Sequence, residues 1–363
     1  MLITIVAGAR PNFVKVAPII RAIQSAKMNG ADIDYRLVHT GQHFDQKMSG
    51  DFFDQLQIPA PHNNLQCHSG TAIQQTASIM CSFENELIQN KPDTVLVVGD
   101  VTSTMAASIA AKKLGIHTVH VEAGIRSGDL AMPEELNRIV TDAICDTFFT
   151  TSITASENLK ASNISEKEIH FVGNTMIDSL LYHLDEIKKP LCWDALNLQS
   201  KTYLLLTLHR PSNVDDPIKL QEILTELATL TKNTKVVFPV HPRTLACIES
   251  NQINCFDIQL ITPQPYLEFI FLVKNAKGII TDSGGITEEA TILNVPCITM
   301  RNTTERPETI THGTNVLVGD NRAQLAKMLN IIEEGNWKSS QGPALWDGKT
   351  AERIINILLC KKD

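Results

Sequence analysis

The stretch Gly278–Ala290 reads GIITDSGGITEEA, and it predicts a buried strand, a tight turn and a helix in direct succession. The Ser-Gly-Gly turn lets backbone N–H groups approach an anion closely at the start of the helix. An acid one turn into that helix can accept both hydroxyls of a ribose, as the acidic residue of dinucleotide-binding folds does. The alternative is a serine-capped helix after a flexible turn. We favour a nucleotide site, because Arg301 and Arg306 follow the next predicted strand.

Outward from this stretch, short β-branched runs alternate with longer segments of helical spacing. The expected strands are Leu2–Ala7, Tyr35–His39, Thr94–Val98, His117–Val121, Thr147–Thr151 and Ile169–Val172, and then Lys201–Thr207, Lys235–Pro239, Ile258–Ile261, Gly278–Thr281, Pro296–Met300 and Thr314–Leu317. The expected helices are Phe13–Ala26, Ala72–Gln89, Ser103–Leu114, Pro133–Ala143, Pro217–Leu230, Tyr266–Asn275 and Glu288–Leu293. This alternation predicts βαβ units and parallel sheets covered by helices. We therefore predict an α/β protein with two Rossmann-like domains, residues 1–172 and 173–363, whose parallel sheets face each other across a cleft.

Length, charge and cysteine content narrow the class of protein. A chain of 363 residues is too long for one ordinary core and suits two domains. The net charge of -8 and the lack of a basic block argue against a nucleic-acid partner. No apolar run is long enough to span a bilayer, so we expect no membrane partner. The eight cysteines form no CxxC pair, which argues against a zinc site and favours free thiols in the cytoplasm.

Charged residues follow several strands of the first half, at the sheet edge where α/β folds bind ligands. Arg10 and Lys15 lie near a predicted helix start and form either an anion site or a charged surface. Asp100 follows a buried strand, where an N-cap and a functional carboxylate are equally good interpretations. Glu122 ends the next strand among small residues, where a carboxylate is costly unless it is paired or hydrated, and this favours function.

Two further groups can be read both ways. Glu134 and Arg138 are spaced i,i+4 at a helix start, which fits a surface pair as well as a site. His209 and His241 each follow a predicted strand. A single histidine is more often structural, but two such turns favour a rim that faces a ligand.

Together these motifs resemble the non-hydrolysing UDP-N-acetylglucosamine 2-epimerases. They run in family order over nearly the whole chain: GAR10P with Lys15, VGD100, HVE122AGIR, PE134ELNR138, H209R, H241PR, DS283GGITEE289 and TTER306PE. The resemblance implies a GT-B fold whose last helix, near residues 350–360, packs back on the N-terminal domain. It also implies reversible conversion of UDP-GlcNAc to UDP-ManNAc, with neither a cofactor nor a metal, in a protein that is commonly a homodimer.

The resemblance also implies a role for each matching residue. Phe269 would lie against uracil with Gln264 nearby, Ser283, Gly284 and Gly285 would hold the diphosphate, and Glu289 would bind the ribose. Arg10, His209 and Arg306 would meet phosphate or sugar, and Lys15, Asp100, Glu122, Glu134 and Arg138 would line the sugar side. The expected catalytic residues are Asp100, Glu122, Glu134 and His209. Which carboxylate acts as the base and which as the acid is left open.

The family chemistry that the resemblance implies is elimination of UDP to 2-acetamidoglucal, followed by re-addition to the other face of C2. Four alternatives stay open: a hydrolysing relative that releases UDP and ManNAc, an epimerase for a modified sugar such as UDP-2,3-diacetamido-2,3-dideoxyglucuronate, a glycosyltransferase, and a non-catalytic UDP-sugar sensor, against which the many carboxylates at strand ends count. Gln42 and His43 match a segment that binds an activating second UDP-GlcNAc in some members. The residues after them differ from the family pattern, so the sequence leaves activation open.

Overall fold

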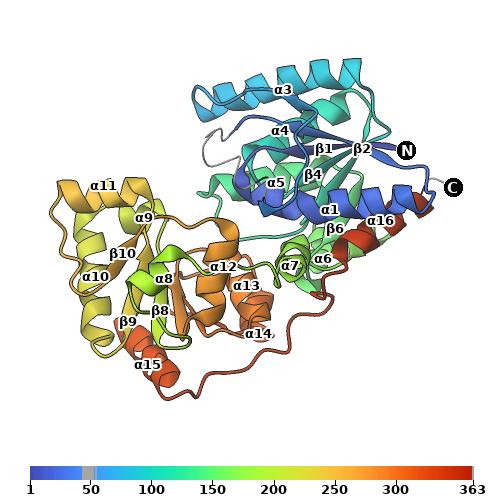
Figure 1. Cartoon of the computed structure of the whole chain (residues 1–363). Coiled ribbons are helices and arrows are strands. Elements are labelled where there is room, and N and C mark those ends of the chain that lie inside the picture. The colour runs from blue at the N-terminus through green and yellow to red at the C-terminus, as the bar shows by residue number, and fades with distance from the viewer. Residues whose placement is uncertain (43–52, 54, 362–363) are drawn as a thin grey trace. The chain divides into compact units, whose positions relative to one another are not determined.

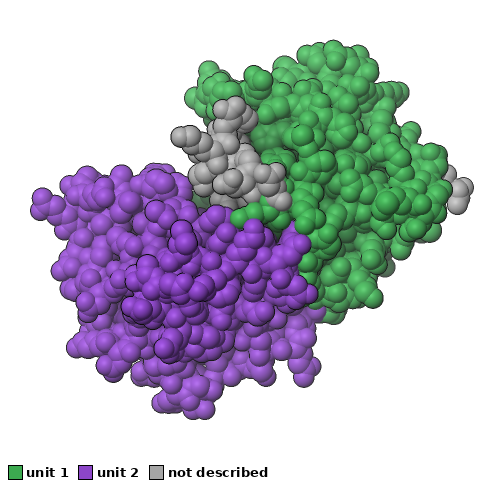
Figure 2. All heavy atoms as spheres, in the orientation of Figure 1, with its two compact units in different colours: residues 1–182, 344–363 green, residues 183–343 purple. Residues whose placement is uncertain are grey.

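The computed structural model describes residues 1–42, 53 and 55–361, and the chain divides into two compact units. Unit 1 comprises Met1–Tyr182 together with Ala344–Asp363, and unit 2 comprises His183–Pro343 (Figure 2). Each unit contains its own parallel sheet, with helices packed on it (Figure 1). The predicted α/β class with two parallel sheets is therefore confirmed.

Unit 1 contains a seven-stranded sheet in the order β3-β2-β1-β4-β5-β6-β7. Its strands are β1 (Leu2–Ala7), β2 (Asp34–His39), β3 (Asn63–Asn64), β4 (Thr94–Val98), β5 (His117–Val121), β6 (Thr147–Thr150) and β7 (Ile169–Phe171). Its helices are α1 (Arg10–Met28), α3 (Ala72–Gln89), α4 (Thr102–Lys113), α5 (Pro133–Ile144), α6 (Ile153–Ala161), the short η1 (Glu166–Glu168), α7 (Thr175–Tyr182) and α16 (Thr350–Cys360). Every residue of β4 is buried, as expected for a central parallel strand that helices cover on both faces.

Unit 2 contains a six-stranded sheet in the order β10-β9-β8-β11-β12-β13. Its strands are β8 (Tyr203–Thr207), β9 (Lys235–Pro239), β10 (Gln259–Ile261), β11 (Gly278–Thr281), β12 (Cys297–Thr299) and β13 (Asn315–Leu317). Its helices are α8 (Leu191–Ala195), α9 (Pro211–Val214), α10 (Pro217–Leu230), α11 (Pro242–Ser250), α12 (Tyr266–Asn275), α13 (Gly285–Ile292), α14 (Pro307–Thr311) and α15 (Arg322–Glu333).

Both sheets contain a topological switch point, where the direction in which successive strands are added to the sheet reverses. In unit 1 the chain builds outward from β1 to β3 on one side and then from β4 to β7 on the other, so the order reverses between β1 and β4. In unit 2 the reversal lies between β8 and β11. Ligands of open α/β sheets bind beyond the carboxyl ends of the strands at such a point, because the connecting loops diverge there.

The first unit continues beyond residue 172, the boundary expected from the sequence. Helix α7 belongs to unit 1 because the hydroxyl of Ser179 donates to the carbonyl of Val14 in α1. The carboxylate of Asp178 also accepts the N–H groups of Thr350 (3.2 Å) and Ala351 (2.7 Å) at the start of α16. Helix α16 packs against α1 and α7, so the end of the chain completes unit 1. No helix in the described part of the chain is long and apolar enough to cross a membrane.

Candidate functional site

In unit 1 the turn after β4 brings candidate residues from three strand ends together. Gly99 has φ +70°, a conformation that glycine adopts without strain. A Cβ atom at Gly99 would lie 3.1 Å from Nζ of Lys15, 3.3 Å from Oε2 of Glu122 and 3.5 Å from Nδ2 of Asn12. The turn therefore lies directly against Lys15 and Glu122, as expected at the switch point between β1 and β4.

Glu122 is held in an unusual backbone conformation. Its φ is +68° although it has a side chain, and such strain is typical of functional sites. Its carboxylate is buried and forms an ion pair with Lys15. The side chain of Asn12 accepts the N–H groups of Gly8 (3.2 Å) and Ala9 (3.0 Å) and donates to the carbonyl of Val98 (3.0 Å). Asn12 thus fixes the turn between β1 and α1, the helix that carries Lys15.

Asp100 lies beside Glu122 in sheet order and is bound by Arg138. Both Nε (3.0 Å) and Nη2 (2.6 Å) of Arg138 donate to Oδ2 of Asp100. The acid that holds Arg138 from the other side is Glu135 (2.8 Å), which also accepts the N–H groups of Ser127 and Gly128. These hydrogen bonds outweigh the effect of burial and lower the pKa of Glu135.

The structure thus pairs Arg138 with Glu135 and Asp100, and the i,i+4 pair of Glu134 with Arg138 considered from the sequence is wrong. Glu134 is exposed at the start of α5, and within the described part of the chain no ion pair forms to its carboxylate.

In unit 2 a buried aspartate organises the turn after β8. Asp282, at the end of β11, accepts Nδ1 of His209 (2.6 Å), the backbone N–H groups of His209 and Arg210, and Nδ2 of Asn213 (2.9 Å). Burial opposes ionisation, but these bonds prevail and lower the pKa of Asp282. Because Nδ1 of His209 is taken by Asp282 and the side chain is 58% exposed, Nε2 is the ring atom that can meet a ligand.

The Ser-Gly-Gly turn is open to an anion. Ser283 donates its N–H to the hydroxyl of Thr281 (2.9 Å), whereas the N–H groups of Gly284 and Gly285 donate to no residue that the structure describes. A Cβ atom at Gly285 would meet no atom within 4 Å, so the space beside the start of α13 is free. Helix α13 begins here without a side-chain cap. This is the arrangement in which helix N-termini bind phosphate.

Two acids on α13 differ sharply in environment. Glu288 is buried and forms an ion pair with Nε of Arg306, which brings that arginine to α13. Burial, and then the charge of Glu288, raise the pKa of Glu289 to about 8. Unit 2 therefore holds a strongly perturbed carboxyl group next to an open helix start, which is a feature of functional sites.

Three other predicted residues, Phe269, Gln264 and His241, lie on or next to helices α12 and α11 of unit 2. Helix α12 packs against α13 and carries Phe269, which is half-buried against the core of unit 2. Gln264 precedes α12 and donates to the carbonyl of Thr262 (2.7 Å). His241, which we expected on a ligand-facing rim, caps α11 by accepting the N–H of Arg243 (3.3 Å).

Three predictions fall at the limits of the described structure. Gln42 accepts the N–H (3.1 Å) and the hydroxyl (2.7 Å) of Ser103 in unit 1. His43 lies outside the described residues, as does the side chain of Arg10.

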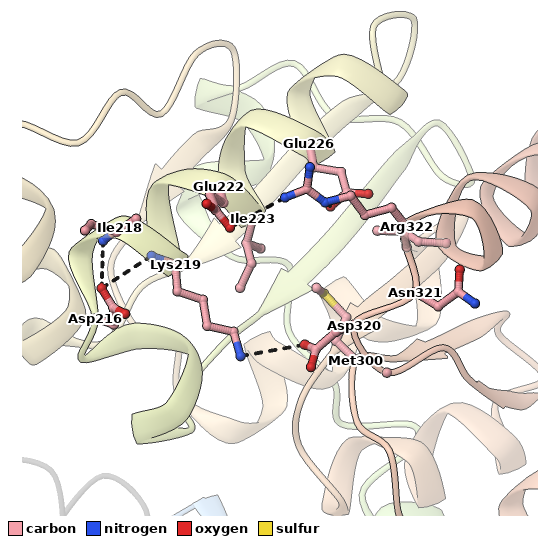
Figure 3. Close-up of a pocket in the computed structure, with 12 residues that line it drawn as sticks. Asp216, Ile218, Lys219, Glu222, Ile223, Glu226, Met300, Asp320, Asn321 and Arg322 are labelled. Atoms are coloured by element: carbon pink, nitrogen blue, oxygen red, sulfur yellow. Dashed lines mark hydrogen bonds and ion pairs between the residues drawn. The ribbon is translucent and has the colours of Figure 1, made fainter.

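A separate hollow of about 370 Å³ lies between α10 and α15 of unit 2 (Figure 3). Its charges pair with one another: Lys219 with Asp320 (3.6 Å), and Arg322 with Glu222 (3.5 Å) and Glu226 (3.3 Å). It contains none of the predicted site residues. Because its acids outnumber its bases, it is a poor place for a diphosphate, and the strand-end residues remain the candidate site.

Comparison with known proteins decides the family. The family described as UDP-N-acetylglucosamine 2-epimerase matches residues 26–359. The chain belongs to this family. The UDP-N-acetylglucosamine 2-epimerase of Methanocaldococcus jannaschii is 40% identical, over 99% of both chains. The crystal structure of that archaeal enzyme in complex with UDP-GlcNAc and UDP superposes with a TM-score of 0.87 over 99% of each chain, at 41% identity.

Two further likenesses bear on substrate and fold. The UDP-2,3-diacetamido-2,3-dideoxy-D-glucuronate 2-epimerase of Pseudomonas aeruginosa is 38% identical, over 99% of both chains. A lipopolysaccharide outer-core galactosyltransferase in its apo form has a TM-score of 0.53 at 17% identity, covering 99% of this chain and 97% of its own. The second likeness shows the GT-B fold alone.

Proposed function

We propose that the chain interconverts UDP-GlcNAc and UDP-ManNAc by eliminating UDP and adding it back, and so feeds the synthesis of surface polysaccharide. The full-length likeness to the archaeal UDP-N-acetylglucosamine 2-epimerase supports this function. The observation that carries the proposal is the set of carboxylates at the switch point of unit 1, because the reaction needs acids that take and return a proton at C2.

Unit 2 has the groups needed to bind a nucleotide and stabilise it as a leaving group. The free N–H groups of Gly284 and Gly285 and the guanidinium of Arg306 would face the diphosphate, with Nε2 of His209 as a further contact. Donors placed where negative charge develops lower the barrier to departure of UDP. Glu289 would accept the ribose hydroxyls, and Phe269 with Gln264 would contact uracil.

Unit 1 would act on the sugar. In the first step a carboxylate removes the C2 proton, the C1–O bond to UDP breaks, and a C1–C2 double bond forms. In the second step a proton is delivered to the other face of C2 while UDP re-forms its bond at C1. Neither step calls on a nicotinamide or a metal.

We assign proton transfer to Asp100 and Glu134, and positioning of the sugar to Glu122. Glu122 suits positioning because its buried carboxylate is already engaged by Lys15. Asp100 is 29% exposed and takes both bonds from Arg138 through Oδ2. Glu134 is exposed, and so it can reach a ligand.

A modified sugar is the second candidate substrate. It is favoured by the likeness to the Pseudomonas aeruginosa enzyme, which is 38% identical over the full length. Such a substrate carries a carboxylate at C6 and would need a further cation on the sugar side. A hydrolysing enzyme that frees ManNAc shares the elimination step and differs in letting water capture the glycal.

The deciding experiment incubates the purified chain with UDP-GlcNAc, UDP-ManNAc and UDP-2,3-diacetamido-2,3-dideoxyglucuronate and resolves the products. The proposal expects the same mixture of the two UDP-hexosamines from either direction. Free ManNAc would instead identify a hydrolase, and turnover of the glucuronate alone would identify the modified-sugar enzyme.

Variants of the acids test the assignment of roles. We expect Asp100→Asn, Glu122→Gln and Glu134→Gln each to lower kcat about 100-fold or more, since each removes a group that must transfer a proton or position the sugar. UDP affinity should change less than threefold, because unit 2 is intact. Glu157→Gln, on the exposed face of α6, is the control and should leave both quantities unchanged. Near-normal rates in all three variants would refute this mechanism.

We further propose that the chain acts as a cytoplasmic homodimer whose ligand is the UDP-sugar, without nucleic acid or a membrane as partner. Helix α3 supports an interface, because Ile73 and Ile88 on it are 81% and 64% exposed. Light scattering should then give twice the mass of one chain. Aspartate substitutions of both isoleucines should return the protein to the monomer.

A further inference from the structure

We propose that His120 and Asp142 form a buried positioning pair, which holds the Gly99–Asp100 turn where the carboxylate of Asp100 can transfer a proton. This inference rests on the proposed function and adds two residues that act through the backbone of the site. His120 is the fourth residue of β5 and Asp142 lies in α5, so the pair joins the sheet to the helix that also carries Arg138.

The pair is fully engaged on both sides. Nδ1 of His120 lies 2.7 Å from Oδ1 of Asp142, and Nε2 lies 2.9 Å from the carbonyl oxygen of Gly99. The carboxylate of Asp142 and the carbonyl of Gly99 are both acceptors, so a ring N–H of His120 can donate to each of them. The ring has an exposed fraction of 0%, so water does not compete for either position.

Asp142 is itself held as an anion. Its Oδ2 accepts Nη1 of Arg126 (2.6 Å) and the N–H of Gly124 (3.1 Å). Burial opposes ionisation, but His120 and then Arg126 prevail and lower the pKa of Asp142. Asp142 therefore ties His120 to the loop that follows Glu122.

The hydrogen bonds of His120 and Asp142 reach the candidate site through the backbone of Gly99. Its N–H donates to Val121 (3.0 Å) and its carbonyl accepts His120, so both of its backbone groups are fixed by β5. Asp100 is the next residue, and a Cβ atom on Gly99 would lie 3.3 Å from Oε2 of Glu122. A shift of this turn would move Asp100 relative to Glu122 and to the sugar. Displacement of a reacting group by about 1 Å can cost about 100-fold in rate.

Two isosteric substitutions separate the two bonds of His120. His120→Gln places an amide N–H near the position of Nε2, so it keeps the donor to Gly99 and loses the one to Asp142. His120→Asn places its N–H near Nδ1, so it keeps the donor to Asp142 and cannot reach Gly99. Both variants place a neutral amide in the same buried site and differ in which bond they keep, so each is the control for the other.

We expect His120→Asn to lower kcat for UDP-GlcNAc about 10- to 100-fold, and His120→Gln to recover at least a third of the wild-type kcat. UDP affinity and the number of UDP sites per chain, both measured by calorimetry, should be unchanged in both variants, and the number of sites reports the folded fraction. Asp142→Asn should lower kcat in the same direction, and adding it to His120→Asn should cost less than the product of the two single effects.

The outcomes separate the two proposals. An active wild type with equal kcat values in both histidine variants would overturn the positioning role and leave the epimerase function standing. A parallel loss of kcat and of UDP sites per chain would likewise overturn it, since that pattern reports general unfolding. A wild type that leaves every UDP-sugar unchanged would overturn both proposals.

Discussion

At the residue scale, we predict that the titration of Glu289 affects both the stability of the protein and its affinity for UDP. Its pKa is raised from 4.5 to about 8 in the folded protein, so folding favours the protonated form. Below pH 4.5 the carboxyl group is protonated in both states and does not change the free energy of unfolding. As pH rises from 4.5 to 8, this group lowers the free energy of unfolding progressively, and above pH 8 the reduction is complete. We predict that Glu289→Gln raises the free energy of unfolding by about 1–3 kcal/mol at pH 8 and has no effect near pH 4.5. Denaturant unfolding at the two pH values measures the difference.

The same residue should make UDP affinity depend on pH. If the ribose hydroxyls donate to an ionised Glu289, wild-type affinity rises with pH up to about 8, because binding no longer has to remove a proton. Glu289→Gln should bind UDP about 10-fold more weakly and lose this dependence. An unchanged pH profile of UDP affinity in the variant, measured by calorimetry, would remove Glu289 from the ribose site.

At the residue scale the sequence could place acids at strand ends but could not choose between neighbours. Glu134 and Glu135 are adjacent, and both fit the start of a helix, yet only Glu135 is buried against Arg138. Successive helical residues point about 100° apart, so which one faces inward depends on how α5 is rotated against the sheet. Asp282 could be recognised in the sequence as part of the Asp-Ser-Gly-Gly stretch. Its five hydrogen bonds to the turn after β8 could not be predicted, because they depend on the pairing of β8 with β11.

At the element scale, helix α16 depends on a distant cap. Its N-cap residue, Lys349, provides no side-chain bond, and the first N–H groups are instead accepted by Asp178 of α7. We predict that Asp178→Ala destabilises the protein by about 1–2 kcal/mol and speeds hydrogen exchange in α16, because those N–H groups lose their acceptor in a buried setting.

Asp178→Asn is the matched control for this prediction. Burial raises the pKa of Asp178, so a neutral amide removes an unfavourable ionisation. It keeps the shape of the side chain and one oxygen acceptor, whereas the two N–H groups are accepted by different oxygens of the carboxylate. The asparagine variant should therefore lose less stability than Asp178→Ala at pH 8. Equal loss in both variants would show that one acceptor oxygen and the side-chain shape are not enough, and that the cap needs both carboxylate oxygens.

Elements with a strong periodic signal could be predicted, and elements determined by tertiary contacts could not. Every strand expected from a β-branched run is present, because fully buried parallel strands need such runs. Helix α7 was not predicted, since it has only eight residues and six of them, polar ones included, are buried by tertiary contacts. Helix α13 begins at Gly285, earlier than the expected Glu288, because glycine is a poor helix former and its presence hides the true start of the helix in the sequence.

At the scale of the whole molecule, the proposed function divides the ligand chemistry between the two units. The perturbed carboxyl Glu289 and the open N–H groups belong to unit 2, whereas Asp100, Glu122 and Glu134 belong to unit 1. A ligand stabilises the part of a protein that it contacts, and local opening there becomes rarer. Hydrogen exchange can therefore report each unit separately in the full chain.

We predict that UDP slows exchange at residues 283–289, and that UDP-GlcNAc adds protection at residues 99–100 and 121–126. The difference between the two ligands is only the sugar, so the added protection reports where the sugar binds. The control is Asp100→Asn, in which UDP protection should persist while the sugar-dependent increment shrinks, because the carboxylate that would contact the sugar has been removed. Mass spectrometry at matched saturation measures both effects. If the increment appeared in residues 183–343 instead, the sugar would be bound by the nucleotide unit, and the acids of unit 1 would lose their assigned role.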